Sequence, residues 1–155
     1  MKLAIEWEDP VLLRSGRREG LIYVVDSEQI LRVPGIYVFA RRWGDGFEAL
    51  YVGKSKNVRS RVKGHFNNLR LMRHLEEAKN GRRVVIVGYP VTKPGQRMEK
   101  VLTLLERGLI RHFLSEGHDL VNQQGTRLRR HSIESSGIPK AFVPTLMYLE
   151  RSRGD

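Results

Sequence analysis

Two short apolar runs decide the fold of this chain: Pro34-Gly35-Ile36-Tyr37-Val38-Phe39 and Leu50-Tyr51-Val52-Gly53-Lys54-Ser55. Each run carries a tyrosine two positions from a glycine, and the charged segment between the runs contains Gly44 and Gly46. Apolar runs of this length that are joined by a glycine-containing loop are typical of an antiparallel hairpin. We therefore predict two paired strands, over residues 36–40 and 49–52.

The chain behind the hairpin predicts a third strand and three helices. Apolar residues at helical spacing indicate helices over about 58–67, 71–79 and 96–115, and Asn80-Gly81 suits a left-handed end of the second. Residues 83–89 contain a continuous β-branched run at 84–87, which is typical of a central strand buried on both faces. In the longest helix Glu106 falls at the edge of a predicted core stripe formed by Met98, Leu102, Leu105, Leu109 and Phe113.

The two ends of the chain give weaker patterns. Apolar runs at residues 3–7 and 21–25 flank a polar turn at 14–20, and favour an extra strand pair or a strand with a short arm. Residues 120–126 read as a polar loop followed by the basic residues 127–131, and beyond them we expect a loop and a short helix near residues 145–151. The predicted class is α+β: one domain with a three-stranded, mainly antiparallel sheet flanked by helices. Its core spans about 34–125, with an N-terminal extension over 1–33 and a C-terminal one over 126–155.

Positive charge is concentrated directly behind the hairpin. The chain has a net charge of +11, and residues 54–83 contribute +8 of it, with 10 basic and 2 acidic side chains. Such an excess favours a polyanionic partner, a nucleic acid or an anionic membrane. We expect no membrane contact, and charge does not distinguish DNA from RNA. The candidate nucleic-acid-binding residues are Lys54, Lys56, Arg59, Lys63, Arg70 and Arg73.

Cysteine is absent from the 155 residues, which excludes disulfides, thiolate zinc sites and thiol nucleophiles. No apolar run approaches the 18 residues of a membrane span, and acidic residues interrupt the N-terminus where a signal peptide has an apolar core. We expect a cytoplasmic protein, as a monomer or a homodimer.

The hairpin resembles the signature of the GIY-YIG nuclease family. Gly35-Ile36-Tyr37 is followed by Tyr51-Val52-Gly53, with valine in place of the isoleucine of the name. Arg61 stands ten positions after Tyr51, where the family has an arginine, and His65 matches a histidine of some homing endonucleases. The lysine directly after the glycine, Lys54, is similar to that of members of the excision-repair branch. Glu106 and Asn122 match the family's glutamate and asparagine in order. The resemblance covers about residues 34–125.

The resemblance implies a metal-dependent endonuclease that hydrolyses DNA. Glu106 is expected to bind one Mg²⁺ or Mn²⁺, which as hard cations prefer oxygen. Arg61 is expected to bind the phosphate, because its planar fork fits two phosphate oxygens. Tyr37 is the candidate general base, supported by Lys54, and His65 is the rival base. Tyr51 is expected to bind phosphate or water, and Asn122 to orient a partner in the site.

Two other readings of the basic face stay open. A catalytically silent nucleic-acid-binding module of the same fold predicts binding that weakens with salt and yields no product. A structural or regulatory subunit acting on a protein partner predicts no nucleic-acid affinity at low salt. The sequence does not decide between nicking and double-strand cleavage.

Overall fold

The centre of the fold is an antiparallel hairpin of two long strands, β5 (Gly35–Trp43) and β6 (Gly46–Ser55). The computed structural model of the chain describes residues 2–121, 129–134, 136 and 146–151. Pro34 directly precedes β5, at a position where its missing N–H interrupts no sheet ladder. The predicted hairpin is confirmed, and both strands are longer than the sequence indicated.

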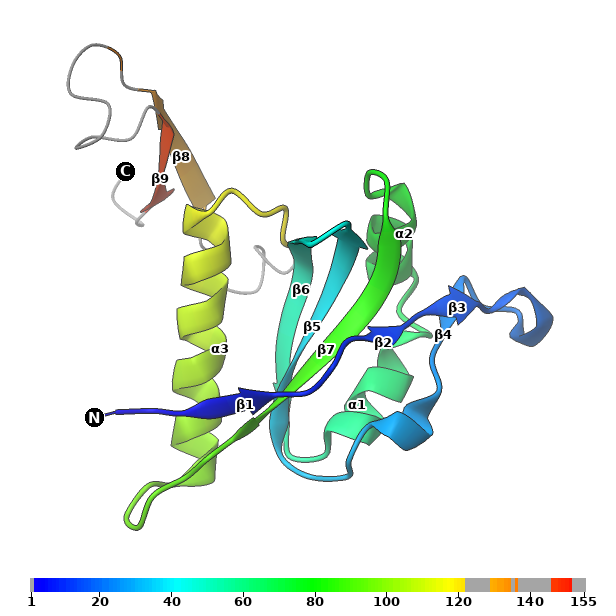
Figure 1. Cartoon of the computed structure of the whole chain (residues 1–155), viewed down its shortest axis with the longest axis horizontal. Coiled ribbons are helices and arrows are strands. Elements are labelled where there is room, and N and C mark those ends of the chain that lie inside the picture. The colour runs from blue at the N-terminus through cyan, green and yellow to red at the C-terminus, as the bar shows by residue number, and fades with distance from the viewer. Residues whose placement is uncertain (1, 122–128, 135, 137–145, 152–155) are drawn as a thin grey trace.

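A fully antiparallel sheet is built around this hairpin (Figure 1). Strand β7 (Arg82–Pro90) pairs with the other side of β5, so β5 and β7 are interior strands and β6 is an edge strand. Strands β1 (Ile5–Trp7) and β2 (Val11–Leu12) both pair with β7. The three predicted strands are thus confirmed, and the N-terminal extension enlarges the sheet to five strands.

Helices cover both faces of the sheet (Figure 1). Helices α1 (Val58–His65) and α2 (Leu69–Glu77) pack on one face, and α3 (Met98–Ser115) packs on the other. The first two helices begin at asparagine caps, because Asn57 and Asn68 each accept a hydrogen bond from a backbone N–H of the first turn. None of the helices in the described residues is long and apolar enough to cross a membrane.

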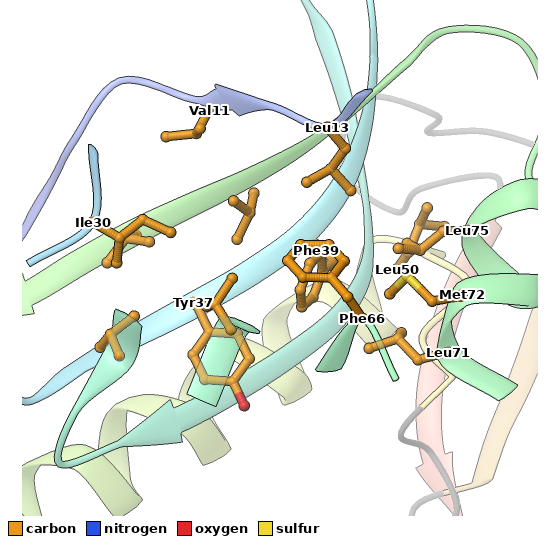
Figure 2. Close-up of a cluster of buried hydrophobic side chains, with 14 residues drawn as sticks. Val11, Leu13, Ile30, Tyr37, Phe39, Leu50, Phe66, Leu71, Met72 and Leu75 are labelled. Atoms are coloured by element: carbon orange, nitrogen blue, oxygen red, sulfur yellow. The ribbon is translucent and has the colours of Figure 1, made fainter. Parts of the chain in front are cut away.

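The core on the α1 and α2 side is built around the aromatic residues of the hairpin (Figure 2). Tyr37 and Phe39 of β5 pack against buried side chains of both helices, among them Val62 and Leu75. The N-terminal extension closes this core with three buried aliphatic side chains, Val11, Leu13 and Ile30. Because those residues lie outside the predicted 34–125 core, the extension is part of the packed structure.

The helix boundaries and faces differ from the expectations in two places. Helix α2 ends at Glu77 and is followed by Ala78 in an extended conformation, so Asn80-Gly81 does not form its cap. Gly81 instead has a φ of +120° in the turn into β7, where a Cβ would come 2.5 Å from the carbonyl oxygen of Arg42. In α3 the expected stripe is only partly buried apart from Leu102, and the buried residues of the helix also include Val101, Ile110 and Leu114.

The ends of the chain pair in ways that local patterns did not show. The apolar runs at 3–7 and 21–25 do not pair with each other, because β1 joins β7 while β4 (Tyr23–Val24) pairs with β3 (Arg14–Ser15). The expected polar turn at 14–20 contains β3 and a short 3-10 helix, η1 (Arg17–Glu19), and a second one, η2 (Ser27–Gln29), follows β4. Each partner is distant in sequence or only two residues long, so periodicity carried no signal for it.

The expected helix near residues 145–151 is wrong. The chain there forms strand β9 (Leu146–Arg151), antiparallel to β8 (Arg129–Glu134), which begins within the basic stretch at 127–131. Leucine, methionine and glutamate favour helix intrinsically, but pairing with another strand overrides a weak propensity.

Candidate active site

The two tyrosines of the hairpin lie on the same face of the sheet. Tyr37 is paired with Gly53 across the β5–β6 ladder and Phe39 with Tyr51, so the tyrosines are diagonal neighbours. Their rings are stacked, with centroids 6.2 Å apart. The register shifts at Phe39 and Ala40, which leaves Leu50 as an extra residue beside Tyr51. A bulge of this kind bends the strand locally and re-aims the side chains next to it.

Gly53 leaves the space that the Tyr37 hydroxyl occupies. A Cβ added to Gly53 would come 2.3 Å from the Tyr37 hydroxyl oxygen and 2.4 Å from the ring carbon that bears it. Any side chain at position 53 would therefore displace the phenol. The glycine of the second tripeptide is thus required by the tyrosine of the first.

His65 forms a hydrogen bond with Tyr37 beneath the sheet. The Tyr37 hydroxyl and His65 Nε2 are 2.7 Å apart, and the direction of donation depends on the imidazole tautomer. His65 is only 5% exposed and is buried on the same helix as the core residues Val58 and Val62. Its ring also contacts Tyr51, at 5.0 Å between centroids. His65 is therefore part of the aromatic cluster.

Burial shifts the pKa of each of these groups toward its neutral form. The pKa of Tyr37 is raised well above its usual value by burial and by the neighbouring Tyr51, and the Arg61 guanidinium opposes this only in part. Burial also raises the pKa of Tyr51. The pKa of His65 is lowered to about 4, first by burial and then by the charge of Arg61. At neutral pH the cluster therefore holds two phenols and a neutral imidazole.

Arg61 lies at the exposed border of this cluster. It is one turn before His65 on α1, and its side chain is exposed, whereas His65 is buried. Its positive charge influences the pKa values of Tyr37, Tyr51 and His65. A guanidinium that is close to two buried rings and the half-buried Tyr51, and is open to solvent on its outer side, can receive a phosphate group.

Lys54 contacts α3 and not Tyr37. Its Nζ atom lies 3.2 Å from Oε2 of Glu106 and donates a hydrogen bond of 2.9 Å to Oγ1 of Thr103. Lys54 follows Gly53 on β6, and successive strand residues point to opposite faces, so its side chain is directed away from Tyr37. The expected support of a Tyr37 phenolate by Lys54 is thus contradicted, and Lys54 instead holds the carboxylate of Glu106.

Glu106 and the tyrosine cluster approach each other at the edge of the sheet. Glu106 comes from α3, on the opposite face from α1, yet its charge raises the pKa of Tyr51. This is possible because Tyr51 belongs to β6 and Glu106 pairs with Lys54 of the same strand. Since β6 is an edge strand, no further strand separates the two faces there. The geometry thus groups Tyr37, Tyr51 and His65, with Arg61 beside them, and links Glu106 to the group through Tyr51.

The donor set suits a hard divalent cation that keeps most of its water. The Glu106 side chain is 22% exposed, and one of its oxygens contacts Lys54, so a bound cation would share the carboxylate with Lys54. No group of three or more histidine, aspartate or glutamate side chains within the described part of the chain can enclose a metal. One carboxylate with several waters is the usual way in which proteins bind Mg²⁺.

The candidate nucleic-acid-binding residues lie on two helices and the strand before them. Lys56, Arg59 and Lys63 are at the start of α1 or along it, and Arg70 and Arg73 line an open groove along α2. Asn122 lies outside the described residues. The residue before it, Val121, donates its backbone N–H to the carbonyl of Leu50 in β6.

One polar residue of the arrangement was missed by the sequence reasoning. Thr103 binds Lys54 together with Glu106, and the two α3 residues are three apart, a spacing that places them on the same side of a helix. The spacing of Thr103 and Glu106 was visible in the sequence, but only the structure shows that both residues bind Lys54.

Comparison with known protein families gives one match. A family described as the GIY-YIG catalytic domain matches residues 34–117, which begin just before β5 and end just after α3. Neither the curated proteins nor the solved structures gave a match.

Proposed function

The chain belongs to the GIY-YIG family, which implies a nuclease-type function, and on that premise we propose that it is a metal-dependent endonuclease hydrolysing DNA phosphodiester bonds. The observation that carries this proposal is the grouping of Tyr37, Tyr51 and Arg61 at the same strand edge as Glu106. Nucleases of the family generally use a divalent metal, and Mg²⁺ or Mn²⁺ is our proposal for this chain.

Phosphate binding is assigned to Arg61 and Tyr51. Hydrolysis adds negative charge to the oxygens around phosphorus, and a guanidinium stabilises that charge at any working pH. The half-buried Tyr51 stays protonated, so its hydroxyl can donate a hydrogen bond to a phosphate oxygen. Asn122 is assigned the role of orienting another residue of the site.

Removal of the water proton is assigned to Tyr37 and His65 together. A phenolate is unfavourable at Tyr37 because burial raises its pKa. The hydrogen bond to neutral His65 offers another route, in which the Tyr37 oxygen accepts the proton of the water while its own proton passes to His65 Nε2. This route requires the His65 tautomer that carries its hydrogen on Nδ1.

Metal binding is assigned to Glu106, oriented by Lys54 and Thr103. When bound, the metal supplies neutralisation of phosphate charge and stabilisation of the departing alkoxide. Lys54 holds the carboxylate beside β6, since it binds one oxygen of Glu106 and is itself held by Thr103. Substrate binding along the basic face is assigned to Lys54, Lys56, Arg59, Lys63, Arg70 and Arg73.

A plasmid assay tests the proposal. Purified protein should nick or linearise supercoiled DNA with Mg²⁺ or Mn²⁺ and stop when EDTA removes the metal. Glu106→Ala and Arg61→Ala should each slow cleavage by at least about 10²-fold, because each removes stabilisation of developing charge. Glu99→Ala is the matched control, an exposed glutamate two turns earlier on α3. Cleavage that survives in both site variants would contradict the assigned site.

A catalytically silent module is the second candidate. The burial of Tyr37, which is 1% exposed, favours it, because a buried phenol is less accessible to a water on the phosphate. This candidate predicts DNA binding that weakens with salt and no product with any metal. The cytoplasmic location, the single-domain organisation and the oligomeric state stay predictions.

A further inference from the structure

A pocket of about 330 Å³ lies beside the start of α1, outside the group of residues assigned to catalysis. It is lined by Arg32, Asn57, Arg59, Ser60 and Lys63, so three of its five lining residues are cationic. Arg32 belongs to the N-terminal extension and precedes the family match, which begins at residue 34. The pocket is therefore formed jointly by the extension and the catalytic domain.

The extension is attached directly to α1 at this pocket. The backbone N–H of Val58 donates to the carbonyl of Val33, and the Arg59 guanidinium donates to the carbonyls of Ile30 and Glu28. These contacts fix Arg59 and the segment that carries Arg32 relative to the helix. The fold therefore positions Arg59 and the backbone at Arg32 beside each other.

The charge of the pocket is not neutralised within the protein. Ion pairs among the described residues involve Arg14, Arg41 and Lys54, and none involves a cation of this pocket. The first turn of α1 adds the partial positive charge of a helix N-terminus, and the Ser60 hydroxyl can donate a hydrogen bond. Three uncompensated cations beside a hydroxyl match the chemistry of a phosphate group.

The position of the pocket relates it to the proposed cleavage site. Arg59 and Lys63 share one side of α1, Arg61 lies on another, and at about 100° per residue Ser60 falls between them. An α-helix is about 10–12 Å wide with its side chains, and a DNA strand carries one phosphate per about 3.4 Å of duplex axis. A strand that crosses α1 from Arg61 would therefore bring a phosphate to the pocket about three nucleotides away.

We propose that this pocket binds a backbone phosphate of the cleaved DNA strand, about three nucleotides from the phosphate at the cleavage site. The proposal rests on the proposed nuclease function and adds a residue, Arg32, that lies outside the catalytic domain. Arg32 and Lys63 are the positions to test, because both are exposed and neither makes a contact that holds the fold. Arg59 is unsuitable, since its substitution would also remove the contacts to Ile30 and Glu28.

The test is the salt dependence of DNA binding by the full chain. Fluorescence anisotropy with a random-sequence duplex in EDTA gives the slope of log affinity against log salt between 50 and 200 mM KCl. Arg32→Ala and Lys63→Ala should each reduce the magnitude of this slope by about 0.9 and weaken binding about fivefold to tenfold at the lowest salt, as expected for one lost phosphate contact. Arg18→Ala is the matched control, an exposed arginine in η1 whose loss should leave the slope unchanged.

The outcomes separate the pocket from the nuclease function. If wild-type protein cleaves plasmid DNA but Arg32→Ala and Lys63→Ala behave like Arg18→Ala, the pocket assignment is overturned and the nuclease function stands. If both variants lose slope while wild-type protein cleaves nothing with Mg²⁺ or Mn²⁺, the pocket assignment is supported and the nuclease function falls. Wild-type protein without salt-dependent binding overturns both.

Discussion

At the scale of single residues, the contact between Tyr37 and Gly53 connects the fold to the proposed chemistry. The phenol occupies the space that a side chain at position 53 would fill, and from there it reaches His65 Nε2. A buried aromatic cluster surrounds the contact on the α1 side, so neither ring can move away without loss of packing. The position of the hydroxyl is therefore set by the glycine opposite it.

Gly53→Ala should damage both stability and cleavage. The added Cβ would overlap the Tyr37 hydroxyl, and overpacking of a core typically lowers the free energy of unfolding by about 1–3 kcal/mol. The displaced phenol should slow cleavage about 10²-fold, because a shift of about 1 Å at a reacting group has that effect. Urea unfolding and the plasmid assay measure the two effects.

Gly64→Ala provides the control for this prediction. A Cβ at Gly64 meets nothing within 4 Å, and the residue lies inside α1. Alanine should there raise the free energy of unfolding by about 0.4–1 kcal/mol, because it restricts the unfolded chain. Equal effects of the two substitutions would contradict the importance of the Tyr37 contact.

The lowered pKa of His65 predicts a loss of stability in mild acid. The folded protein binds the His65 proton with a pKa of about 4, and the unfolded chain with the ordinary value of about 6.5. The unfolded state therefore binds more protons between these values, so stability is complete above pH 6.5 and falls as the pH is lowered toward 4. A shift of this size corresponds to about 3 kcal/mol.

Urea unfolding of wild-type protein and His65→Gln at pH 7.5 and pH 4.5 measures this contribution. Carboxylates that titrate in the same range are common to both proteins, so the difference between their pH dependences isolates His65. Wild-type protein should lose about 2–3 kcal/mol more than the variant does. The same pH dependence in both proteins would show that His65 does not titrate as proposed.

The sequence indicated several of these residues but not all of their neighbours. Tyr37 and Tyr51 come together because the hairpin register is set by the two runs that contain them. The partner of Lys54 was expected wrongly, although strand alternation alone directs the residue after Gly53 to the opposite face. The burial of His65 depends on how α1 packs on the sheet, a long-range property that helical spacing does not determine.

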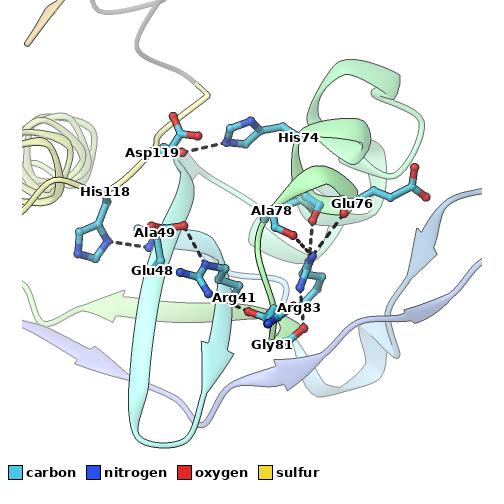
Figure 3. A network of polar contacts seen from close by, with 12 residues as sticks. Arg41, Glu48, Ala49, His74, Glu76, Ala78, Gly81, Arg83, His118 and Asp119 are labelled. Atoms are coloured by element: carbon cyan, nitrogen blue, oxygen red, sulfur yellow. Dashed lines mark hydrogen bonds and ion pairs between the residues drawn. The ribbon is translucent and has the colours of Figure 1, made fainter.

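At the scale of elements, the end of α2 depends on an arginine from the next strand (Figure 3). The last carbonyl groups of a helix have no partner within it. Arg83 of β7 donates hydrogen bonds of 2.6 and 2.7 Å to the carbonyls of Leu75 and Ala78. It also binds the carbonyl of Gly81 at 2.6 Å, so one guanidinium joins the helix, the turn and the strand.

Arg83→Ala should lower the free energy of unfolding by about 2–3 kcal/mol. Hydrogen bonds to a charged group contribute about 1.5–3 kcal/mol each, and the exposed part of this side chain reduces the sum. Arg82→Ala is the matched control, because Arg82 is the exposed neighbouring residue on β7. Amide hydrogen exchange should also show faster opening of α2 in the Arg83 variant. Equal unfolding energies for the two variants would contradict this role.

At the scale of the whole molecule, the family match is smaller than the packed structure. The match covers residues 34–117, but β1 and β2 of the extension pair with β7, and Gly88 permits β1 to pack closely, since a Cβ there would come 2.6 Å from Ile5. The sequence indicated an extension and could not show its pairing, because the partners are more than 70 residues apart. The extension also contributes Arg32 to the proposed phosphate pocket.

Two neighbouring leucines, Leu12 at the end of β2 and Leu13 directly after it, test whether the extension is part of the core. Leu13 is 5% exposed in the cluster that contains Tyr37, whereas Leu12 is 49% exposed. Leu13→Ala should lower the free energy of unfolding by about 2–5 kcal/mol, because it removes buried methyl groups and leaves a cavity. Leu12→Ala makes the same chemical change at an exposed position and should cost less than about 0.5 kcal/mol. If urea unfolding gave equal values for both, the extension would be only an appendage to a domain that folds without it, and the Tyr37 cluster would not depend on residues outside the family match.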